Sequence, residues 1–209
     1  MKIRAKHDKG VNLLEVSAAE SSDTDSWPLV SQLQFRHYHS TFDPELGAVA
    51  SAVLFARHCG SVVEFEGTQI SIDAARAIRT ILPETDELLP VNGMKRDISQ
   101  GVATLISGEA ARMFDSGGSP RVGTSARAIT WSGDFVGPGR NSNQHIGGDI
   151  FTNAALVADR TAVSVALALF VGGKAVRDIY VPPPEKPERE RYRRMAEGLE
   201  HLGVKLQTL

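Results

Sequence analysis

The segment of the sequence richest in residues that could bind a ligand covers residues 132–149. Its glycines would let backbone N–H groups approach a phosphate or a carboxylate closely. Arg140 could form a bidentate contact with an anion, and His145 is a residue type that transfers protons or ligates metals. The candidate ligand-binding residues are Ser132, Gly133, Asp134, Gly137, Gly139, Arg140, Asn141, Asn143, His145 and Asp149.

The surroundings of this segment suggest where it would lie in a fold. Residues 126–131 read as a strand, and residues 150–158 read as a helix with Asp149 as its N-cap. Open α/β proteins bind ligands at the carboxyl ends of parallel strands, and the start of a helix favours anions. The segment holds neither GxxxxGK[ST] nor GxGxxG. Two interpretations therefore stay open, a ligand-binding loop and a polar surface loop ordered by its own hydrogen bonds or by a partner chain.

Histidine and cysteine give weaker signals elsewhere. His37 and His39 alternate along an expected strand, so they would share one face and form a metal site if Asp43 joined them. Exposed strand histidines are the plainer interpretation. His58 suits a helix end, where a cation interacts favourably with the helix dipole. Cys59 follows an apolar helical run and reads as a buried structural thiol.

Composition limits the classes of function. Of the residues, 42% are hydrophobic, and the formal net charge is -2. The negative net charge argues against general electrostatic binding of nucleic acid. The arginines of residues 185–202 alternate with glutamates, as on an ion-paired helix face. The single cysteine cannot form an internal disulfide, which suits a reducing compartment. The first residues show no secretory signal. The apolar run at residues 161–173 is too short to span a bilayer. We expect a cytoplasmic protein without a membrane segment.

Residues 1–108 are expected to form a small α+β region. Two strands flank a turn at the start, and Asp43 with Pro44 opens a helix that closes at Gly60. A second helix is expected to start at Ser71 or Asp73 and to stop at Pro83. The expected strands are residues 2–5, 12–16, 30–38 and 61–66, with residues 69–72 as a possible partner of the last, and the expected helices are residues 44–59 and 74–82.

Residues 126–209 are expected to form a parallel, doubly wound, Rossmann-like α/β region, after a Gly/Ser/Pro connector at residues 109–125. Its final elements are a strand, a crossover helix rich in Glu and Arg, and a last strand. The apolar residues 161–171 fit either a helix or a buried strand. No internal repeat is visible in the sequence. The expected order is strand 126–131, helix 150–158, the ambiguous run 161–171, strand 174–181, helix 185–202 and strand 204–209.

The same region resembles a known enzyme family. The run 128–133, the strand 176–181 and the segment 188–206 are similar to the opening strands and helices of the PP-loop ATP pyrophosphatases, especially the 7-cyano-7-deazaguanine synthase-like branch. The resemblance implies a parallel nucleotide-binding sheet and adenylation of a substrate with ATP through a Ser-Gly-Gly-x-Asp-Ser loop. Here Asp134 stands where the second glycine would be, and the loop is longer. The resemblance therefore implies a degenerate loop in a binding subunit or a non-catalytic partner of another chain.

Two hypotheses of function follow. The first is that residues 132–149 bind a small molecule carrying a phosphate, with ATP or another nucleotide as the ligand. The second is a non-catalytic structural or adaptor subunit of a multi-protein assembly, as a homo- or hetero-oligomer. The sequence shows no Ser-His-Asp order, no His-Glu-x-x-His and no paired-carboxylate spacing, so it assigns no catalytic residue and leaves enzymatic activity open.

Overall fold

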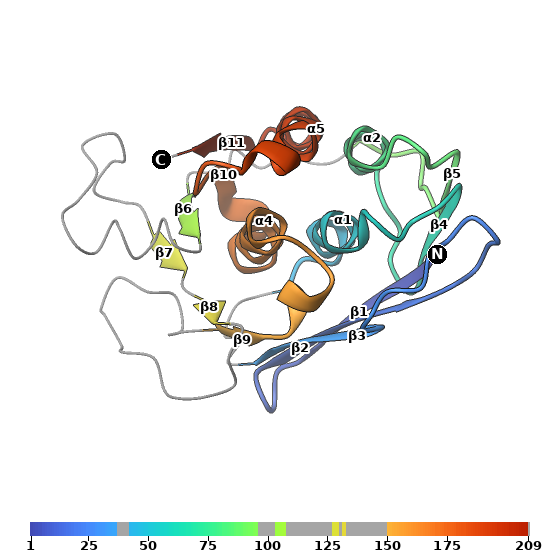
Figure 1. Cartoon of the computed structure of the whole chain (residues 1–209), viewed down its shortest axis with the longest axis horizontal. Coiled ribbons are helices and arrows are strands. Elements are labelled where there is room, and N and C mark those ends of the chain that lie inside the picture. Colours follow the sequence, from blue (N-terminus) through green and yellow to red (C-terminus); the bar gives the residue numbers. More distant parts are fainter. Residues whose placement is uncertain (37–41, 96–102, 108–126, 130, 133–149, 209) are drawn as a thin grey trace.

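The protein has a mixed α/β fold, as its sequence predicts. The computed structural model describes residues 1–36, 42–95, 103–107, 127–129, 131–132 and 150–208 (Figure 1). The elements are β1 (Lys2–Asp8), β2 (Leu13–Ala19), β3 (Gln32–Arg36), α1 (Pro44–Phe55), β4 (Val62–Phe65), α2 (Ile72–Ile81), β5 (Glu87–Leu89), β6 (Ala103–Ser107), β7 (Arg127–Ile129), β8 (Trp131–Ser132), β9 (Ile150–Thr152), η1 (Ala154–Leu156), α4 (Arg160–Gly172), η2 (Gly173–Ala175), β10 (Val176–Val181), η3 (Lys186–Glu188), α5 (Arg189–Glu200) and β11 (Lys205–Thr208).

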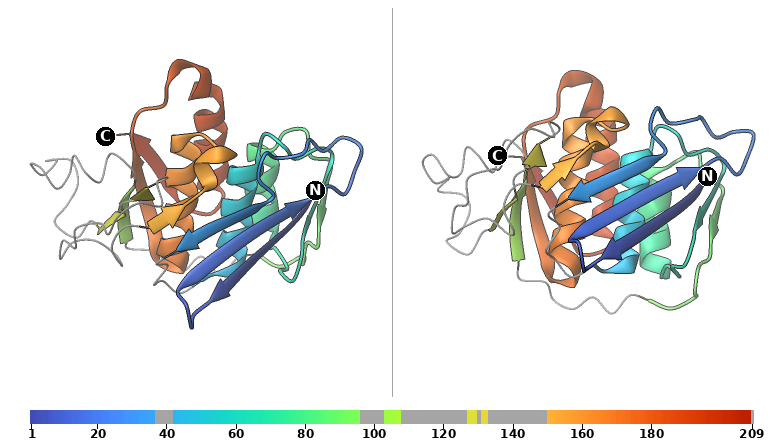
Figure 2. Two further views of the ribbon diagram at one scale, coloured as in Figure 1. Left: turned by 60° about the horizontal axis from the view of Figure 1, so that its bottom comes forward. Right: turned by 90° about the horizontal axis from the view of Figure 1, so that it is seen from below.

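The larger sheet is mixed and has the strand order β5-β4-β1-β2-β3-β9-β8. The predicted hairpin at the start is confirmed, since β1 and β2 pair antiparallel from Lys2↔Ala19 to Asp8↔Leu13. Strand β3 continues this meander. On the other side of β1, strands β4 and β5 pair in parallel. Inward side chains of β1 to β3 are buried and outward ones are more exposed, so one face of this sheet covers the core and the other faces solvent (Figure 2).

The smaller sheet has the strand order β11-β10-β6-β7, and each of its neighbouring pairs is parallel. The predicted parallel pairing of β10 and β11 is thus confirmed. The predicted doubly wound arrangement is wrong. Helices α1, α2, α4 and α5 all lie inside an arch of strands, between the two sheets, instead of covering both faces of one sheet (Figure 1). Helices α1, α4 and α5 pack on strands as well as on helices, and α2 packs mainly on α5 and α1, so the helices between the sheets serve both of them.

Side-chain caps start the main helices. Asp43 accepts hydrogen bonds from Glu45 N and Leu46 N at the start of α1, as predicted, and Ser71 caps α2. Helix α1 ends at Phe55 and not at Gly60. Residues 161–171 are helical, because Asp159 caps α4 and the run is completely buried between helix α1 and strands β6 and β10.

The N-terminal and C-terminal halves of the chain contain the same arrangement of helices and strands. In the N-terminal half the order is β3, α1, β4, α2, β5, and in the C-terminal half it is β9, α4, β10, α5, β11. Strand β4 lies between β1 and β5, and β10 lies between β6 and β11, all in parallel. Strands β3 and β9 pair with each other, α1 packs on α4, and α2 packs on α5 (Figure 1). The repeat is one of structure, although none is visible in the sequence.

Helices α1 and α4 run antiparallel. Arg57, just beyond the end of α1, contacts Asp159 at the start of α4. At the opposite end, the rings of Phe42 and Phe170 lie 6.4 Å apart between centroids. The facing surfaces are rich in alanine and glycine, which allows close packing of the two backbones.

Several local predictions fail for identifiable reasons. Residues 150–158 form strand β9 and the short 3-10 turn η1 and not a helix, since Ile150, Phe151 and Thr152 are β-prone and pair with β3 and β8. The predicted strand 126–131 divides into β7 and β8, which belong to different sheets. Residues 69–72 contribute only the bridge Ile70↔Val91. Strands β5 and β6 were not predicted.

The buried apolar side chains form one core cluster that includes residues of both halves. The predicted connector, residues 109–125, lies outside the described residues. In the described part of the chain, no helix is long and apolar enough to cross a bilayer.

Candidate functional site

Most of the predicted ligand-binding segment lies outside the described residues. Of the ten candidates, Ser132 alone is described, and its backbone pairs with Phe151 where β8 and β9 run in parallel. The other nine fall within residues 133–149: Gly133, Asp134, Gly137, Gly139, Arg140, Asn141, Asn143, His145 and Asp149.

One argument for anion binding at this segment is overturned. The sequence predicts a helix directly after Asp149, whose positive end would face the ligand. The chain instead enters strand β9 at Ile150. A helix first appears at Arg160, and there the carboxylate of Asp159 already accepts the hydrogen bond of Ala162 N at 2.8 Å. Within the described residues, no helix begins directly after this segment.

The carboxyl ends of the parallel strands β6, β7 and β10 lie at one edge of the smaller sheet. Strands β6 and β7 stay in register up to the pair Ser107↔Ile129, and β6 pairs with β10 up to Ile106↔Tyr180. From β6 the chain continues to β7 on one side, whereas from β10 it continues through α5 to β11 on the other. In open α/β proteins, ligands bind where the connections from neighbouring strand ends diverge.

The alternative interpretation of His37, His39 and Asp43 as a metal site falls largely outside the described residues. His37 and His39 lie outside the described residues. Asp43, their predicted carboxylate partner, is the N-cap of α1, and its Oδ1 accepts two backbone hydrogen bonds at 3.0 Å. Across the described ranges, no group of three or more His, Cys, Asp or Glu side chains is arranged to hold a metal ion.

Residues 57–59 follow the end of α1. The imidazole of His58 reaches across to the segment before β3, where its Nδ1 lies 3.1 Å from Ser26 Oγ. The Cys59 thiol lies 3.9 Å from Met1 Sδ. Burial raises the pKa of Cys59 to about 12, so the thiol stays protonated at neutral pH and its interpretation as a structural residue holds.

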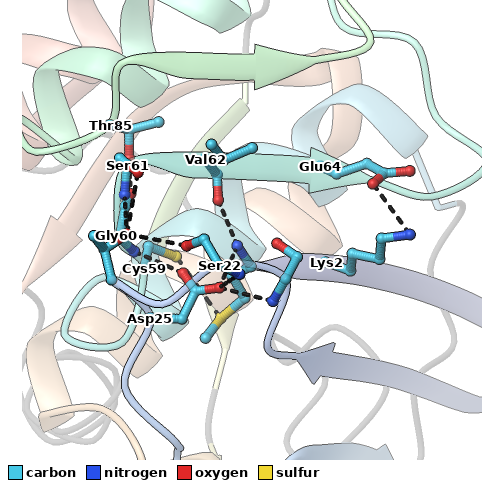
Figure 3. A network of polar contacts seen from close by, with 12 residues as sticks. Lys2, Ser22, Asp25, Cys59, Gly60, Ser61, Val62, Glu64 and Thr85 are labelled. Carbon is cyan, nitrogen blue, oxygen red and sulfur yellow. Dashed lines mark hydrogen bonds and ion pairs between the residues drawn. The ribbon is translucent and has the colours of Figure 1, made fainter.

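A buried polar network fixes the segment that carries Ser26 (Figure 3). The carboxylate of Asp25 is fully buried and forms an ion pair with the Met1 ammonium at 2.7 Å. It also accepts hydrogen bonds from Ser21 N, Ser22 N and Gly60 N, at 2.9 to 3.0 Å. One side chain therefore joins the start of β1, the segment between β2 and β3, and the turn before β4.

The electrostatics of Asp25 follow from these contacts. Burial alone would raise its pKa, but the hydrogen bond from the Met1 ammonium and those from three backbone N–H groups outweigh it and lower the pKa from 3.8 to about 2. Asp25 is therefore ionised at every physiological pH. The network is a structural anchor, since its charged groups are fully paired and closed to solvent.

A second charged cluster lies where the two halves meet. Asp159 Oδ2 accepts from Arg57 at 3.4 Å and from Arg191 of α5, while Asp159 Oδ1 caps α4. The carboxylate is almost completely buried, and Arg191 is three-quarters buried. This cluster connects the end of α1 with the starts of α4 and α5. Its two arginines, Arg57 and Arg191, pair with the carboxylate of Asp159.

Sequence reasoning missed the contact between Ser26 and His58 and the network of Asp25. Thirty-two residues separate Ser26 from His58, and the serine stands in an acidic, Ser-rich run that reads as a solvated loop. No spacing rule joins such residues, because only the packing of α1 under β2 and β3 brings them together. The one available signal was a histidine directly after an apolar helix, which is ambiguous.

Comparisons with known proteins identify no relative of this chain. No protein-family model matches it, and neither the curated proteins nor the solved structures include a match. The functional conclusion therefore depends on the residues and the geometry of the chain itself.

Proposed function

We propose that the protein binds a small molecule carrying a phosphate, such as a nucleotide, at the carboxyl ends of strands β6, β7 and β10. The observation that carries this proposal is the divergence of the chain at the ends of β6 and β10. Two glycine-rich segments follow in the chain, residues 108–126 after β6 and residues 133–149 after β8. Backbone N–H groups of such segments and Arg140 would hold the phosphate.

The proposal keeps the PP-loop resemblance as a hypothesis about origin. The parallel pairing of β6, β7, β10 and β11 supports it. The placement of all described helices inside the arch of strands, and of β8 and β9 in the other sheet, speaks against a close relationship. A degenerate, non-catalytic binding subunit working in the cytoplasm is the form of the proposal that agrees with both observations.

Isothermal titration with ATP, AMP and inorganic pyrophosphate tests the proposal. We expect binding at micromolar to millimolar ligand that is lost in Arg140→Gln. The matched control is Arg76→Gln, which removes an exposed arginine of helix α2 and should bind as the natural chain does. Absence of heat at millimolar concentrations of all three ligands would remove the proposal.

A second candidate function is that of an adaptor subunit. Its supporting observation is the outer edge of the larger sheet, where β5 and the residues after it expose Leu89, Val91 and Met94. Contiguous exposed apolar side chains next to a sheet edge are typical of surfaces that bind another protein.

The mass of the complex purified from its native host separates the two candidates. An adaptor should co-purify with a partner, and the triple substitution of Leu89, Val91 and Met94 by serine should release it. The matched control is Val11→Ser, an exposed valine in the turn between β1 and β2. A monomer without partners under both conditions counts against the adaptor.

A further inference from the structure

Ser26 and His58 form a polar pair at the surface of the N-terminal half. Ser26 Oγ lies 3.1 Å from His58 Nδ1, and the backbone N–H of Ser26 donates to the carbonyl of His58 at 3.0 Å. The hydroxyl is exposed, and the imidazole is half-buried. The hydroxyl also lies 3.3 Å from the carbonyl oxygen of Arg57, to which it can donate. When its proton is turned toward His58 instead, a serine hydroxyl in contact with an imidazole is the minimum arrangement for activating a nucleophile by a general base.

The pair is held rigidly from both sides. Asp25, the residue before Ser26, accepts a hydrogen bond from Gly60 N, two residues after His58. The turn at Gly60 approaches Thr24 so closely that a Cβ there would lie 2.2 Å from Thr24 Oγ1. The backbones that carry the two side chains are therefore fixed to each other, as a reacting pair requires.

The imidazole is oriented and kept neutral. Burial lowers the pKa of His58, and the positive charge of Arg57 lowers it further. The ring also donates hydrogen bonds to the backbone carbonyls of Ser26 and Val157. These bonds raise the pKa of His58, but the net pKa remains below its ordinary value. A neutral ring carries a single N–H, so it donates to one of these carbonyls at a time, and its other nitrogen can then accept a proton.

The backbone N–H of Trp27 completes the set of groups. In serine hydrolases the N–H of the residue after the nucleophile donates to the developing oxyanion. Among the described residues, the Trp27 N–H has no hydrogen-bond partner. It follows Ser26 directly, so it is placed to serve an oxygen bonded to a carbon that Ser26 attacks.

Exposed apolar side chains occur on the segments that carry or contact the pair. Trp27, Leu29 and Leu156 are exposed to 64%, 79% and 55%. Residues 26–34 and 153–157 run side by side. At one end, His58 hydrogen-bonds to both Ser26 and Val157. At the other end, the Asn153 side chain accepts a hydrogen bond from Gln34 N and donates one to Gln32 O. Exposed apolar side chains on neighbouring segments would suit an apolar acyl chain.

From this arrangement we propose that Ser26 is the nucleophile and His58 the general base of an esterase site for apolar acyl esters. Ser26 Oγ bonds to the ester carbonyl carbon while its proton moves to His58. The carbon–oxygen bond to the alcohol then breaks, and the alcohol leaves with the proton from His58. Water repeats the sequence on the acyl-serine, releasing the carboxylic acid and restoring Ser26.

Covalent labelling of the whole chain with a fluorophosphonate probe tests the proposal. We expect one adduct on Ser26, located in the tryptic peptide of residues 10–36, and slow hydrolysis of 4-nitrophenyl butyrate. Because the mapping uses the natural chain, it does not depend on the folding of any variant. An unlabelled peptide 10–36, or an adduct on another serine of that peptide, would overturn the proposal.

Variants separate a reacting pair from a structural one. Ser26→Ala and His58→Gln should each lower labelling and hydrolysis by about 100-fold or more while the melting temperature changes little. Ser17→Ala, in the same tryptic peptide but on the outward face of β2, should react like the natural chain. The labelling rate should fall on acidification as His58 binds a proton, and the lowered pKa of His58 moves this fall to a lower pH than for an ordinary imidazole. Equal labelling of Ser26→Ala and the natural chain would contradict the proposal.

Discussion

The two halves of the molecule share an order of helices and strands but connect their first strands differently. In the N-terminal half, β1, β2 and β3 are antiparallel, and residues 9–12 suffice to join β1 to β2. In the C-terminal half, β6 pairs in parallel with β7, and β8 in parallel with β9, across residues 108–126 and 133–149. Parallel neighbours need long connections, because the chain must return to the same edge of the sheet before it pairs again. Strand direction alone therefore accounts for the length of both glycine-rich segments, and ligand binding must be argued from their composition and position.

The halves also differ in how charged groups stabilise them. Asp25 forms a closed, buried network within the N-terminal half, whereas Asp159 forms partly exposed ion pairs, one with Arg191 of its own half and one with Arg57 across the boundary. Substitutions that remove one kind of contact at a time can establish which half limits stability.

The largest effect is expected from Asp25→Asn. The substitution leaves the Met1 ammonium buried without its counter-charge, so the free energy of unfolding should fall by about 3 kcal/mol. Urea denaturation followed by circular dichroism measures this. Asp23→Asn, an exposed neighbour, is the matched control and should change stability little. A loss below 1 kcal/mol would show that the N-terminal half does not depend on this network.

Acidification should affect the N-terminal half in a defined range of pH. The pKa of Asp25 is about 2 in the folded chain and 3.8 when unperturbed, so the unfolded state binds the proton first as the pH falls. The contribution of Asp25, about 2 kcal/mol, is complete above pH 3.8 and is lost as the pH falls toward 2. Denaturation curves between pH 2 and 5 measure it. Asp25→Asn should lack this component, and equal slopes in both proteins would contradict the assignment.

Packing between the halves can be tested at Gly198 of α5. A Cβ at this position would lie 2.8 Å from Ala77 O of α2, so Gly198→Ala should separate α2 from α5 and cost about 2 kcal/mol. Gly93→Ala is the control, because no atom lies within 4 Å of the added Cβ. The difference between the two melting temperatures measures the effect. Similar values would mean that the α2–α5 contact is easily rearranged.

The smallest expected effect compares two equivalent helix caps. Asp43→Ala removes only the cap of α1 and should cost about 1 kcal/mol. Asp159→Ala removes the cap of α4 together with the contacts of Arg57 and Arg191, and should cost about 1 kcal/mol more. Chemical denaturation of both variants gives the difference. Equal costs would show that the arginines contribute nothing to joining the halves.

The sequence predicts the elements whose signals are local. Helices α1, α2 and α5 follow from capping residues and apolar periodicity, and β1, β2 and β10 follow from β-prone residues bounded by turns or prolines. Strand β9 was mistaken for a helix because two alanines and a leucine follow it, while its strand character depends on pairing with β3, more than a hundred residues earlier. Strand β5 is only three residues long, and its pairing with β4 is likewise not encoded locally.

The candidate sites show the same division between local and distant information. A glycine-rich segment with an arginine is visible in the sequence, and its position after a strand was predicted from neighbouring residues. The Ser26–His58 pair was not predictable, because it depends on the anchoring of one segment to the turn beyond α1. The helix start that the sequence placed at Asp149 belongs instead to Asp159, ten residues later, since the intervening residues pair as a strand.

The run of chain from β7 into β8 has a consequence for unfolding. Arg127–Ile129 pairs with the smaller sheet, and Trp131–Ser132, two residues further on, pairs with the larger one. A fluctuation that opens either sheet would therefore disturb the other, because a single residue separates the two strands. The molecule should melt in one cooperative transition, with amide hydrogens of α1 and α4 exchanging at a common, slow rate.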